Sequence, residues 1–416
     1  MDGVWAQSGL TGTWTGSWTR DGDALAVTMY FKQDSGGWAG SFDSDRLRVT
    51  GIPLQDVSVT PPAVQWKIVG DATTMSFRGE LRGGAISGEF DERGVRGTFT
   101  MERTGEAVAH PEERDLTFNN GEVVLGGTLL APSPSGHNAP ALVFLHGSGS
   151  EARSASKYLA TRFVRAGFAA LIFDKRGVGH STGDWRTATP DDLAGDAAAA
   201  VEALRKSPGI DPGRIGIHGH SQGGALAPLV AAKVPNLAFV IASAAPGLQL
   251  DQVEIYSVEN SIGVKALAPA EAALARAYVA TLVATAYSGA PRKPLLDAWE
   301  KVRDKPWAIE PPPEGSSYWS ISRGFGAYDP VTYWRKVASP VLLVYGADDE
   351  RVPPRASAAR IMAALAEGAA ESASVRILPH ADHTLRLHSV GGWPSTPSGY
   401  PDILIEWARQ AVGPAN

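Results

Sequence analysis

The pentapeptide Gly219-His220-Ser221-Gln222-Gly223 contains a serine whose hydroxyl could act as a nucleophile. Before it, Ile215 and Ile217 fit a short buried strand, and after it the run ALAPLVAAKV fits a helix of small apolar residues. A serine on a sharp turn between a strand and a helix is exposed, and the flanking glycines leave room for that turn. The N–H groups and dipole of the helix N-terminus would favour a developing oxyanion. This pattern predicts acyl transfer from a serine.

A second match to the same pattern occurs at Gly179-His180-Ser181-Thr182-Gly183. It also follows a strand-like stretch, but Asp184, Thr187 and Pro190 come next and no helical pattern begins there. We therefore interpret the second match as a loop and predict Ser221 as the nucleophile.

A serine hydroxyl is a weak nucleophile at neutral pH, so it needs a histidine base and a carboxylate that holds the histidine. Asp348 and Asp349 follow one predicted strand, and His380 and His383 follow the next. Groups in loops at the carboxyl ends of parallel strands meet at one edge of a sheet. The chain order is therefore Ser, Asp, His, with each residue after a separate strand.

The remaining candidate histidines are less well placed for proton transfer. His146, His218 and His220 lie beside the predicted turn or in the loop after an earlier strand, where we expect packing or supporting roles. His388 comes late after the last predicted strand, and His380 is expected to support its loop. His383 is the base that we predict.

The elements that must position these residues alternate between strand and helix from about residue 114 onward, which predicts a mostly parallel sheet with helices on both faces. A hairpin is expected first, with its turn at Asn119-Asn120-Gly121. The further predicted strands cover 141–145, 168–173, 215–217, 238–242, 341–345 and 374–378, and the predicted helices cover 152–166, 191–206, 356–366 and 403–410.

Two regions do not follow this alternation. Residues 248–339 are too long for a crossover and read as a mostly helical cap, which should wall the substrate pocket together with the loop 391–400. Residues 1–105 carry Gly-x-aromatic units and period-two segments, which indicate an antiparallel β-barrel or sandwich. Its tryptophans should fill its core, although they could bind a sugar or a lipid.

Composition narrows the function classes. The chain has 416 residues, and its net charge of −6 argues against a nucleic-acid surface. It has no cysteine, which argues against a thiolate metal site and against disulfides. No apolar run approaches the length of a membrane span. Val4-Trp5-Ala6 before Gln7 is similar to the end of a signal-peptidase site, so export with removal of a signal and a cytoplasmic location both stay open.

Four motifs occur in order along the chain: His146-Gly147-Ser148-Gly149, Asp174-Lys175-Arg176-Gly177-Val178-Gly179, the Ser221 pentapeptide, and Gly346-x-x-Asp349-x-x-Val352-Pro353 before a terminal histidine. On these motifs, the region from about 114 to 411 resembles the α/β-hydrolase superfamily of serine hydrolases, and the whole chain resembles bacterial carboxylesterases with an extra N-terminal β domain.

The resemblance implies roles for particular residues. The last motif selects Asp349 as the acid, with Asp348 as the alternative, and His383 as the base. The oxyanion hole would use the backbone N–H groups of Ser148 and Gln222. No metal or organic cofactor is implied. A separate expectation is that Asp174 and Arg176 form an ion pair that braces their loop.

Together these observations predict an α/β-hydrolase fold with a helical cap and an N-terminal β domain, divided at 1–105, 106–247, 248–339 and 340–416. The predicted activity is hydrolysis of small-molecule esters with short or medium acyl chains. An acyl-CoA thioesterase and an aminopeptidase-like amidase would use the same residues. A glycan- or lipid-binding protein with a vestigial hydrolase domain is the alternative of another class. Homo-oligomerisation is left open.

Overall fold

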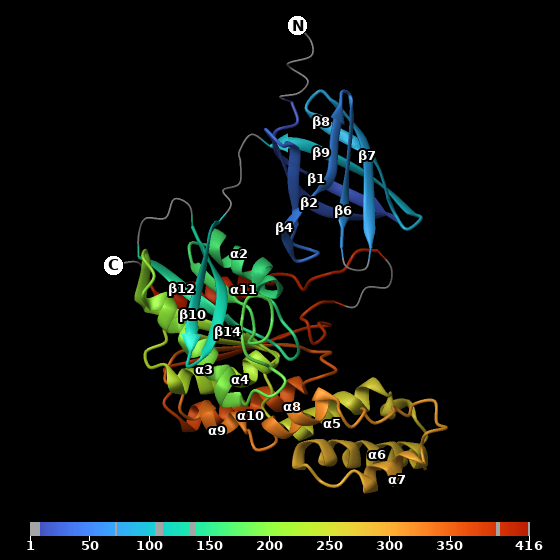
Figure 1. Cartoon of the computed structure of the whole chain (residues 1–416), viewed down its shortest axis with the longest axis vertical. Coiled ribbons are helices and arrows are strands. Elements are labelled where there is room, and N and C mark those ends of the chain that lie inside the picture. The colour runs from blue at the N-terminus through green and yellow to red at the C-terminus, as the bar shows by residue number, and fades with distance from the viewer. Residues whose placement is uncertain (1–8, 71–72, 105–110, 133–137, 388–391, 415–416) are drawn as a thin grey trace. The chain divides into compact units, whose positions relative to one another are not determined.

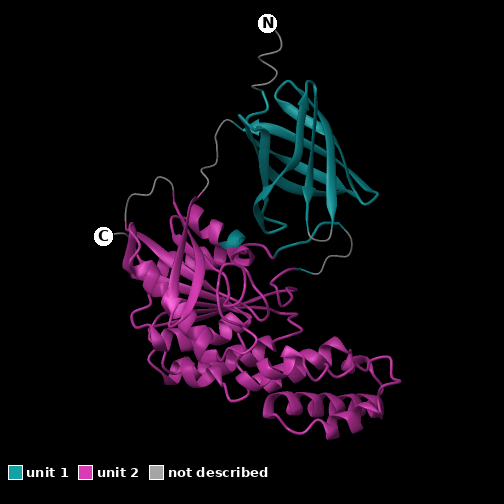
Figure 2. Cartoon of the chain, in the orientation of Figure 1, with its two compact units in different colours: residues 1–110, 157–159, 387–396 teal, residues 111–156, 160–386, 397–416 magenta. Residues whose placement is uncertain are grey.

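The computed structural model describes residues 9–70, 73–104, 111–132, 138–387 and 392–414. The proposed signal-peptidase site, His388 and the predicted domain boundary at residues 105 and 106 lie outside the described residues. The chain forms two compact units (Figure 2). One comprises residues 1–110, 157–159 and 387–396, and the other comprises 111–156, 160–386 and 397–416. Two short segments that the sequence assigned to the hydrolase part are thus grouped with the β domain.

The first unit is built on one antiparallel sheet of nine strands (Figure 1). Its strands are β1 (Gly12–Arg20), β2 (Asp23–Asp34), β3 (Gly37–Ser44), β4 (Val49–Pro53), β5 (Gln55–Thr60), β6 (Ala63–Val69), β7 (Thr74–Arg82), β8 (Ala85–Glu92) and β9 (Val95–Thr104). They lie in the order β4-β3-β2-β1-β9-β8-β7-β6-β5, so the two edge strands are consecutive in the chain. Leu54, which lies between these two strands in the chain, donates its N–H to the carbonyl of Gly40 on β3 at 2.8 Å. The sheet curls into a near-barrel, as predicted (Figure 1).

Aromatic side chains fill the core of this unit. Trp14, Trp18 and Trp66 are at most 1% exposed, and Trp66 stacks on Phe77 with ring centroids 5.1 Å apart. Trp393 belongs to the same apolar cluster. These tryptophans fill the core and do not form an exposed binding face. Trp393 also lies in this core, whereas the sequence predicted that residues 391–400 wall the substrate pocket.

The second unit contains a mostly parallel sheet of eight strands in the order β10-β11-β13-β12-β14-β15-β16-β17. Its strands are β10 (Glu112–Asn120), β11 (Val123–Ala131), β12 (Ala139–Leu145), β13 (Ala169–Phe173), β14 (Ile210–His220), β15 (Val240–Ser243), β16 (Val341–Gly346) and β17 (Ala373–Leu378). The predicted hairpin is formed by β10 and β11; β11 also pairs antiparallel with β13, and the remaining pairs are parallel.

Helices cover both faces of this sheet (Figure 1). One face carries α2 (Lys157–Arg165), which the 3-10 turn η1 (Arg153–Ser156) precedes, and α11 (Asp402–Val412). The other face carries α3 (Pro190–Arg205), α4 (Gln222–Lys233) and α10 (Pro354–Glu367). The predicted α/β-hydrolase fold is confirmed by this arrangement.

The predicted helical insertion lies between β15 and β16. It contains α5 (Leu250–Ser261), η2 (Val264–Ala266), α6 (Pro269–Ser288), α7 (Lys293–Trp299), α8 (Ser317–Phe325) and α9 (Pro330–Trp334). Most of it has an apolar cluster of its own, in which Tyr278, Leu282 and Trp307 are buried. Trp334 instead joins the core beneath the sheet. Among the described residues, no helix is both long and apolar enough to cross a membrane.

Candidate active site

The turn that carries Ser221 joins the end of β14 directly to the first residue of α4. Ser221 has φ 54° and ψ −113°, a backbone conformation that costs a non-glycine residue about 1–3 kcal/mol. Its N–H donates to the Ser243 carbonyl at 2.9 Å, and its carbonyl accepts the N–H of Ala225 at 2.9 Å. These bonds hold the strained serine between the sheet and the helix.

The glycines on either side of the turn are required by close backbone contacts. A Cβ atom on Gly219 would lie 2.2 Å from the Gly223 carbonyl oxygen, and a Cβ on Gly223 would lie 2.8 Å from that of His146. The turn folds back on itself, and the loop after β12 packs against it. Both glycines of the pentapeptide therefore follow from local packing.

Ser221, His383 and Asp349 lie within one chain of hydrogen bonds. The Nε2 atom of His383 lies 3.0 Å from Ser221 Oγ, and its Nδ1 atom lies 2.9 Å and 3.0 Å from the two carboxylate oxygens of Asp349. Because the carboxylate only accepts, Nδ1 carries the proton and Nε2 is free to accept one from the serine. Asp349 is 1% exposed and His383 is 6% exposed.

Backbone groups hold the carboxylate and the imidazole in place. The N–H groups of Arg351 and Val352 both donate to Asp349 Oδ1 at 2.8 Å. On the other side, His220 Nε2 donates to the backbone carbonyl of His383 at 2.9 Å. The supporting role that the sequence suggested for His220 is thus a hydrogen bond to the loop that carries His383.

The other candidate bases have separate partners. His146 donates to the Phe173 carbonyl, and burial lowers its pKa to about 4. His218 lies 3.1 Å from Ser243 Oγ, and burial lowers its pKa to about 3. Both are neutral at physiological pH. His380 has an exposed side chain, 3.7 Å from Asp348.

The second pentapeptide lies in a loop after β13, as predicted. Ser181 is 8% exposed; its Oγ donates to the Asp174 carbonyl at 2.7 Å and accepts the N–H of Gly126 at 3.1 Å. Its hydroxyl thus ties the loop to β11.

The expected ion pair between Asp174 and Arg176 is wrong, because each residue has a different partner. Asp174 accepts two side-chain bonds from Arg153, at 2.8 and 3.1 Å. Arg176 donates twice to Asp196 on α3, both times at 2.7 Å. The two residues brace the loop through separate partners, and no local spacing in the sequence indicates Arg153 or Asp196 as those partners.

A pocket of about 270 Å³ opens at Ser221 and His383. Ser148 and Gln222, the predicted oxyanion donors, also line it. The insertion supplies apolar and aromatic lining from α5, α6 and α8: Leu250, Val253, Tyr287, Tyr318, Ile321 and Phe325.

Glu254 of α5 also lines this pocket, and sequence reasoning missed it. Burial raises the pKa of Glu254, while the nearby Arg351 and Tyr318 oppose that rise. Among the described residues, no group of three or more His, Asp or Glu side chains has the arrangement of a metal site.

Residues 136–387, well over half of the chain, match the family described as serine aminopeptidase, S33, and the chain belongs to this family. The protein is therefore a hydrolase of the α/β-hydrolase superfamily, as predicted.

Individual proteins are similar over shorter stretches. The chain is 28% identical to a multifunctional-autoprocessing repeats-in-toxin protein of Vibrio cholerae over 50% of this chain and 4% of the toxin. It is 40% identical to the thiohydrolase aneE of Aspergillus aculeatus over 22% of this chain and 29% of that protein. The chain thus spans less than a third of either curated relative. A solved esterase structure from Pyrococcus furiosus has a TM-score of 0.47 at 17% identity, covering 72% of this chain and 89% of the esterase.

Proposed function

We propose that this protein is a serine hydrolase that cleaves carboxylic esters of short or medium acyl chains. Ser221 is the nucleophile, His383 the general base and Asp349 the carboxylate that orients His383. The observation that carries the proposal is the buried hydrogen-bonded chain from Asp349 through His383 to Ser221, which ends at the mouth of a pocket.

The first half of the reaction forms an acyl-enzyme. Ser221 Oγ attacks the ester carbonyl carbon while its proton passes to His383 Nε2, and the carbonyl oxygen becomes an oxyanion. The backbone N–H groups of Ser148 and Gln222 receive that oxyanion. The bond to the alcohol oxygen then breaks, and His383 returns its proton to the leaving alcohol.

The second half releases the acid. Water attacks the acyl carbon and gives its proton to His383, the Ser221–acyl bond breaks, and the proton returns to Ser221 Oγ. Asp349 stabilises the imidazolium that forms in each half. The position of Nδ1 between both Asp349 oxygens supports this role, because that bond fixes the tautomer.

The pocket supports a small substrate. Binding sites for drug-sized ligands usually measure about 300–1,000 Å³, and this one measures about 270 Å³. Its lining combines apolar side chains with polar ones, which include the acidic Glu254, the basic Arg351 and two tyrosines. These features favour an acyl group of a few carbons over a long chain.

Thioesters and amides are the competing substrate classes. The similarity to a thiohydrolase favours thioesters, and the description of the family favours the amide bond of an N-terminal residue. Esters are the easiest of the three to test, and the same three residues would serve each class.

The test compares p-nitrophenyl esters from acetate to palmitate with butyryl-CoA and amino-acid p-nitroanilides. We expect the highest kcat/KM for short esters, with a steep fall toward palmitate and a loss of roughly 10⁴-fold or more in Ser221→Ala. Higher kcat/KM on the CoA thioester or the anilides would replace the ester assignment. No turnover of any substrate by the wild type would favour the glycan- or lipid-binding alternative.

A further inference from the structure

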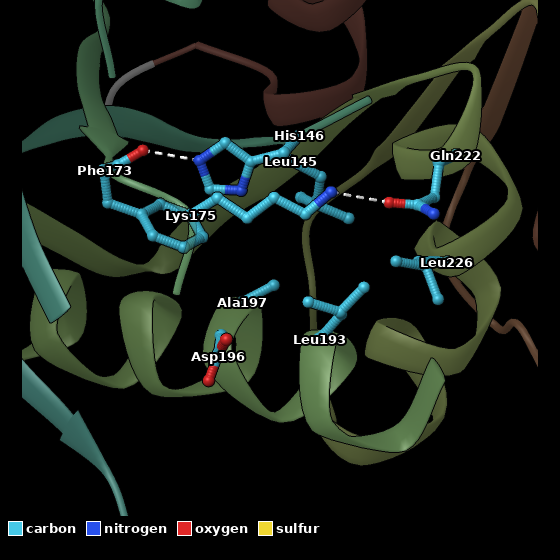
Figure 3. A pocket seen from close by; sticks show the side chains of 9 residues that line it. All are labelled: Leu145, His146, Phe173, Lys175, Leu193, Asp196, Ala197, Gln222 and Leu226. Atoms are coloured by element: carbon cyan, nitrogen blue, oxygen red, sulfur yellow. Dashed lines mark hydrogen bonds between the residues drawn. The ribbon is translucent and has the colours of Figure 1, made fainter. Parts of the chain in front are cut away.

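Lys175 is a buried lysine with no place in the reaction described above. It follows β13 in the loop that begins at Asp174, and it is 2% exposed. Its Nζ donates to the Gly147 carbonyl and to Gln222 Oε1, both at 2.8 Å. Figure 3 shows the bond to Gln222. A buried ammonium is costly unless it is hydrogen-bonded, so these two bonds define where the side chain lies.

The two partners of Lys175 are covalently joined to the two oxyanion donors. Gly147 precedes Ser148, and in a trans peptide the carbonyl and the following N–H point in opposite directions. An ammonium that binds the Gly147 carbonyl therefore turns the Ser148 N–H away from itself. The Gln222 side chain anchors the first residue of α4, whose backbone N–H is the second donor. Both Ser148 and Gln222 line the pocket at Ser221.

We propose that Lys175 is a positioning residue for the oxyanion hole, and that it fixes the N–H groups of Ser148 and Gln222 together. This inference rests on the proposed function, because it needs a reaction that passes through an oxyanion at Ser221. One side chain thereby links the loop after β12, the loop after β13 and the start of α4.

The surroundings of Lys175 keep the ammonium in place. Leu145, Phe173, Leu193 and Leu226 enclose it, beside a cavity of about 10 Å³ (Figure 3). The ring of Trp185 lies 5.4 Å from Nζ, within the range of a cation–π contact. The side chain therefore has little freedom to leave its two acceptors.

Several titratable groups lie around the ammonium. Burial lowers the pKa of Lys175 to about 8, and the carboxylate of Glu151 opposes that shift. His146 is neutral, with its pKa lowered to about 4 mainly by burial. Asp174 and Asp196, the other carboxylates nearby, are bound by arginines. The Lys175 side chain is thus a charged ammonium below about pH 8, and above this pH it loses its charge and one donor hydrogen. We therefore expect turnover to fall as pH rises through this value.

The main test is Lys175→Met, which keeps the length of the side chain and removes its donors. We expect kcat on p-nitrophenyl butyrate to fall about 100-fold with little change in KM, because loss of one oxyanion donor costs roughly 10²–10³. The alkaline fall in kcat near pH 8 should disappear. The measured rate is divided by the concentration of Ser221 that a fluorophosphonate labels, so unfolded protein does not contribute to kcat. Lys206→Met, at an exposed lysine after α3, is the matched control and should behave as wild type.

A second variant covers the case in which Lys175→Met fails to fold. Gln222→Glu keeps the shape and the backbone N–H of residue 222 but places a carboxylate on the ammonium. Because an opposite charge favours the charged form of Lys175, the alkaline fall should move to higher pH.

Wild-type kcat and an unchanged alkaline limb in Lys175→Met, or an unmoved limb in Gln222→Glu, would overturn the role of Lys175 and leave the proposed function standing. Turnover by Ser221→Ala at the wild-type rate would overturn both.

Discussion

Ser181 and Ser221 each lie at the centre of a G-H-S-x-G pentapeptide after a strand, but their hydroxyl groups are used differently. Ser181 Oγ bonds two backbone groups and closes a loop. Ser221 Oγ lies 3.0 Å from His383 Nε2, beside a pocket. In the first copy the positive φ angles fall on Gly179 and Gly183, whereas in the second the serine itself has φ 54°.

The comparison shows that the helix after the pentapeptide matters more than the pentapeptide itself. In the second copy α4 begins one residue after the serine, so the chain must reverse sharply and the serine takes the strained angle. In the first copy the chain continues as a loop as far as α3, which begins at Pro190. The loop leaves the serine free to adopt relaxed angles and to bond the neighbouring strand.

The largest effect that we expect distinguishes the two serines by activity. Ser221→Ala should lower kcat by roughly 10⁴-fold or more, because removal of the nucleophile of such a triad leaves only binding and oxyanion contacts. Steady-state kinetics on p-nitrophenyl butyrate measure this. Ser181→Ala is the matched control, and a comparable loss in that variant would contradict the comparison.

A nearly equal effect is expected at the residue that holds His383. Asp349→Asn preserves shape but favours the wrong histidine tautomer, so kcat should fall by about 10⁴-fold. Asp348→Asn changes the neighbouring, more exposed carboxylate and should leave kcat within a few-fold. The reverse result in this pair would assign the acid to Asp348.

For Ser181→Ala we expect a loss of stability instead of activity. The change leaves the Gly126 N–H without its hydroxyl acceptor, and an unsatisfied buried group costs about 1–3 kcal/mol. Urea unfolding measures the difference, while kcat should stay near the wild-type value. An unchanged free energy of unfolding would show that this hydroxyl does not brace the loop.

The smallest effect concerns the acid beside Ser181. Burial alone would raise the pKa of Asp174, but hydrogen bonds from Arg153 and the His180 N–H lower it to about 2. Its charged form therefore stabilises the fold above the ordinary aspartate pKa of about 4, and this contribution is lost as pH falls toward 2. Asp174→Asn should be less stable than wild type at pH 7, with a smaller gap at pH 3. Thermal unfolding at both pH values measures this, and an equal gap would contradict it.

Local patterns were sufficient to predict the turn at Ser221 and the loops of Asp349 and His383, because each depends on a strand and the few residues after it. The curled β domain was likewise predictable from period-two segments and glycine spacing. The tertiary partners of individual side chains could not be predicted from the sequence. His220 bonds a carbonyl 163 residues away, and Lys175 bonds a side chain 47 residues away. Such contacts depend on how the loops meet, which no local spacing encodes.

The most direct test of the central claim is to identify the serine that a fluorophosphonate modifies. Trypsin separates the two candidates, because residues 177–186 contain Ser181 and residues 215–233 contain Ser221. Mass spectrometry of the labelled native protein should find the adduct at Ser221 alone, and acid denaturation before labelling should abolish it. An adduct at Ser181, or labelling of Ser221 that persists after denaturation, would contradict the account.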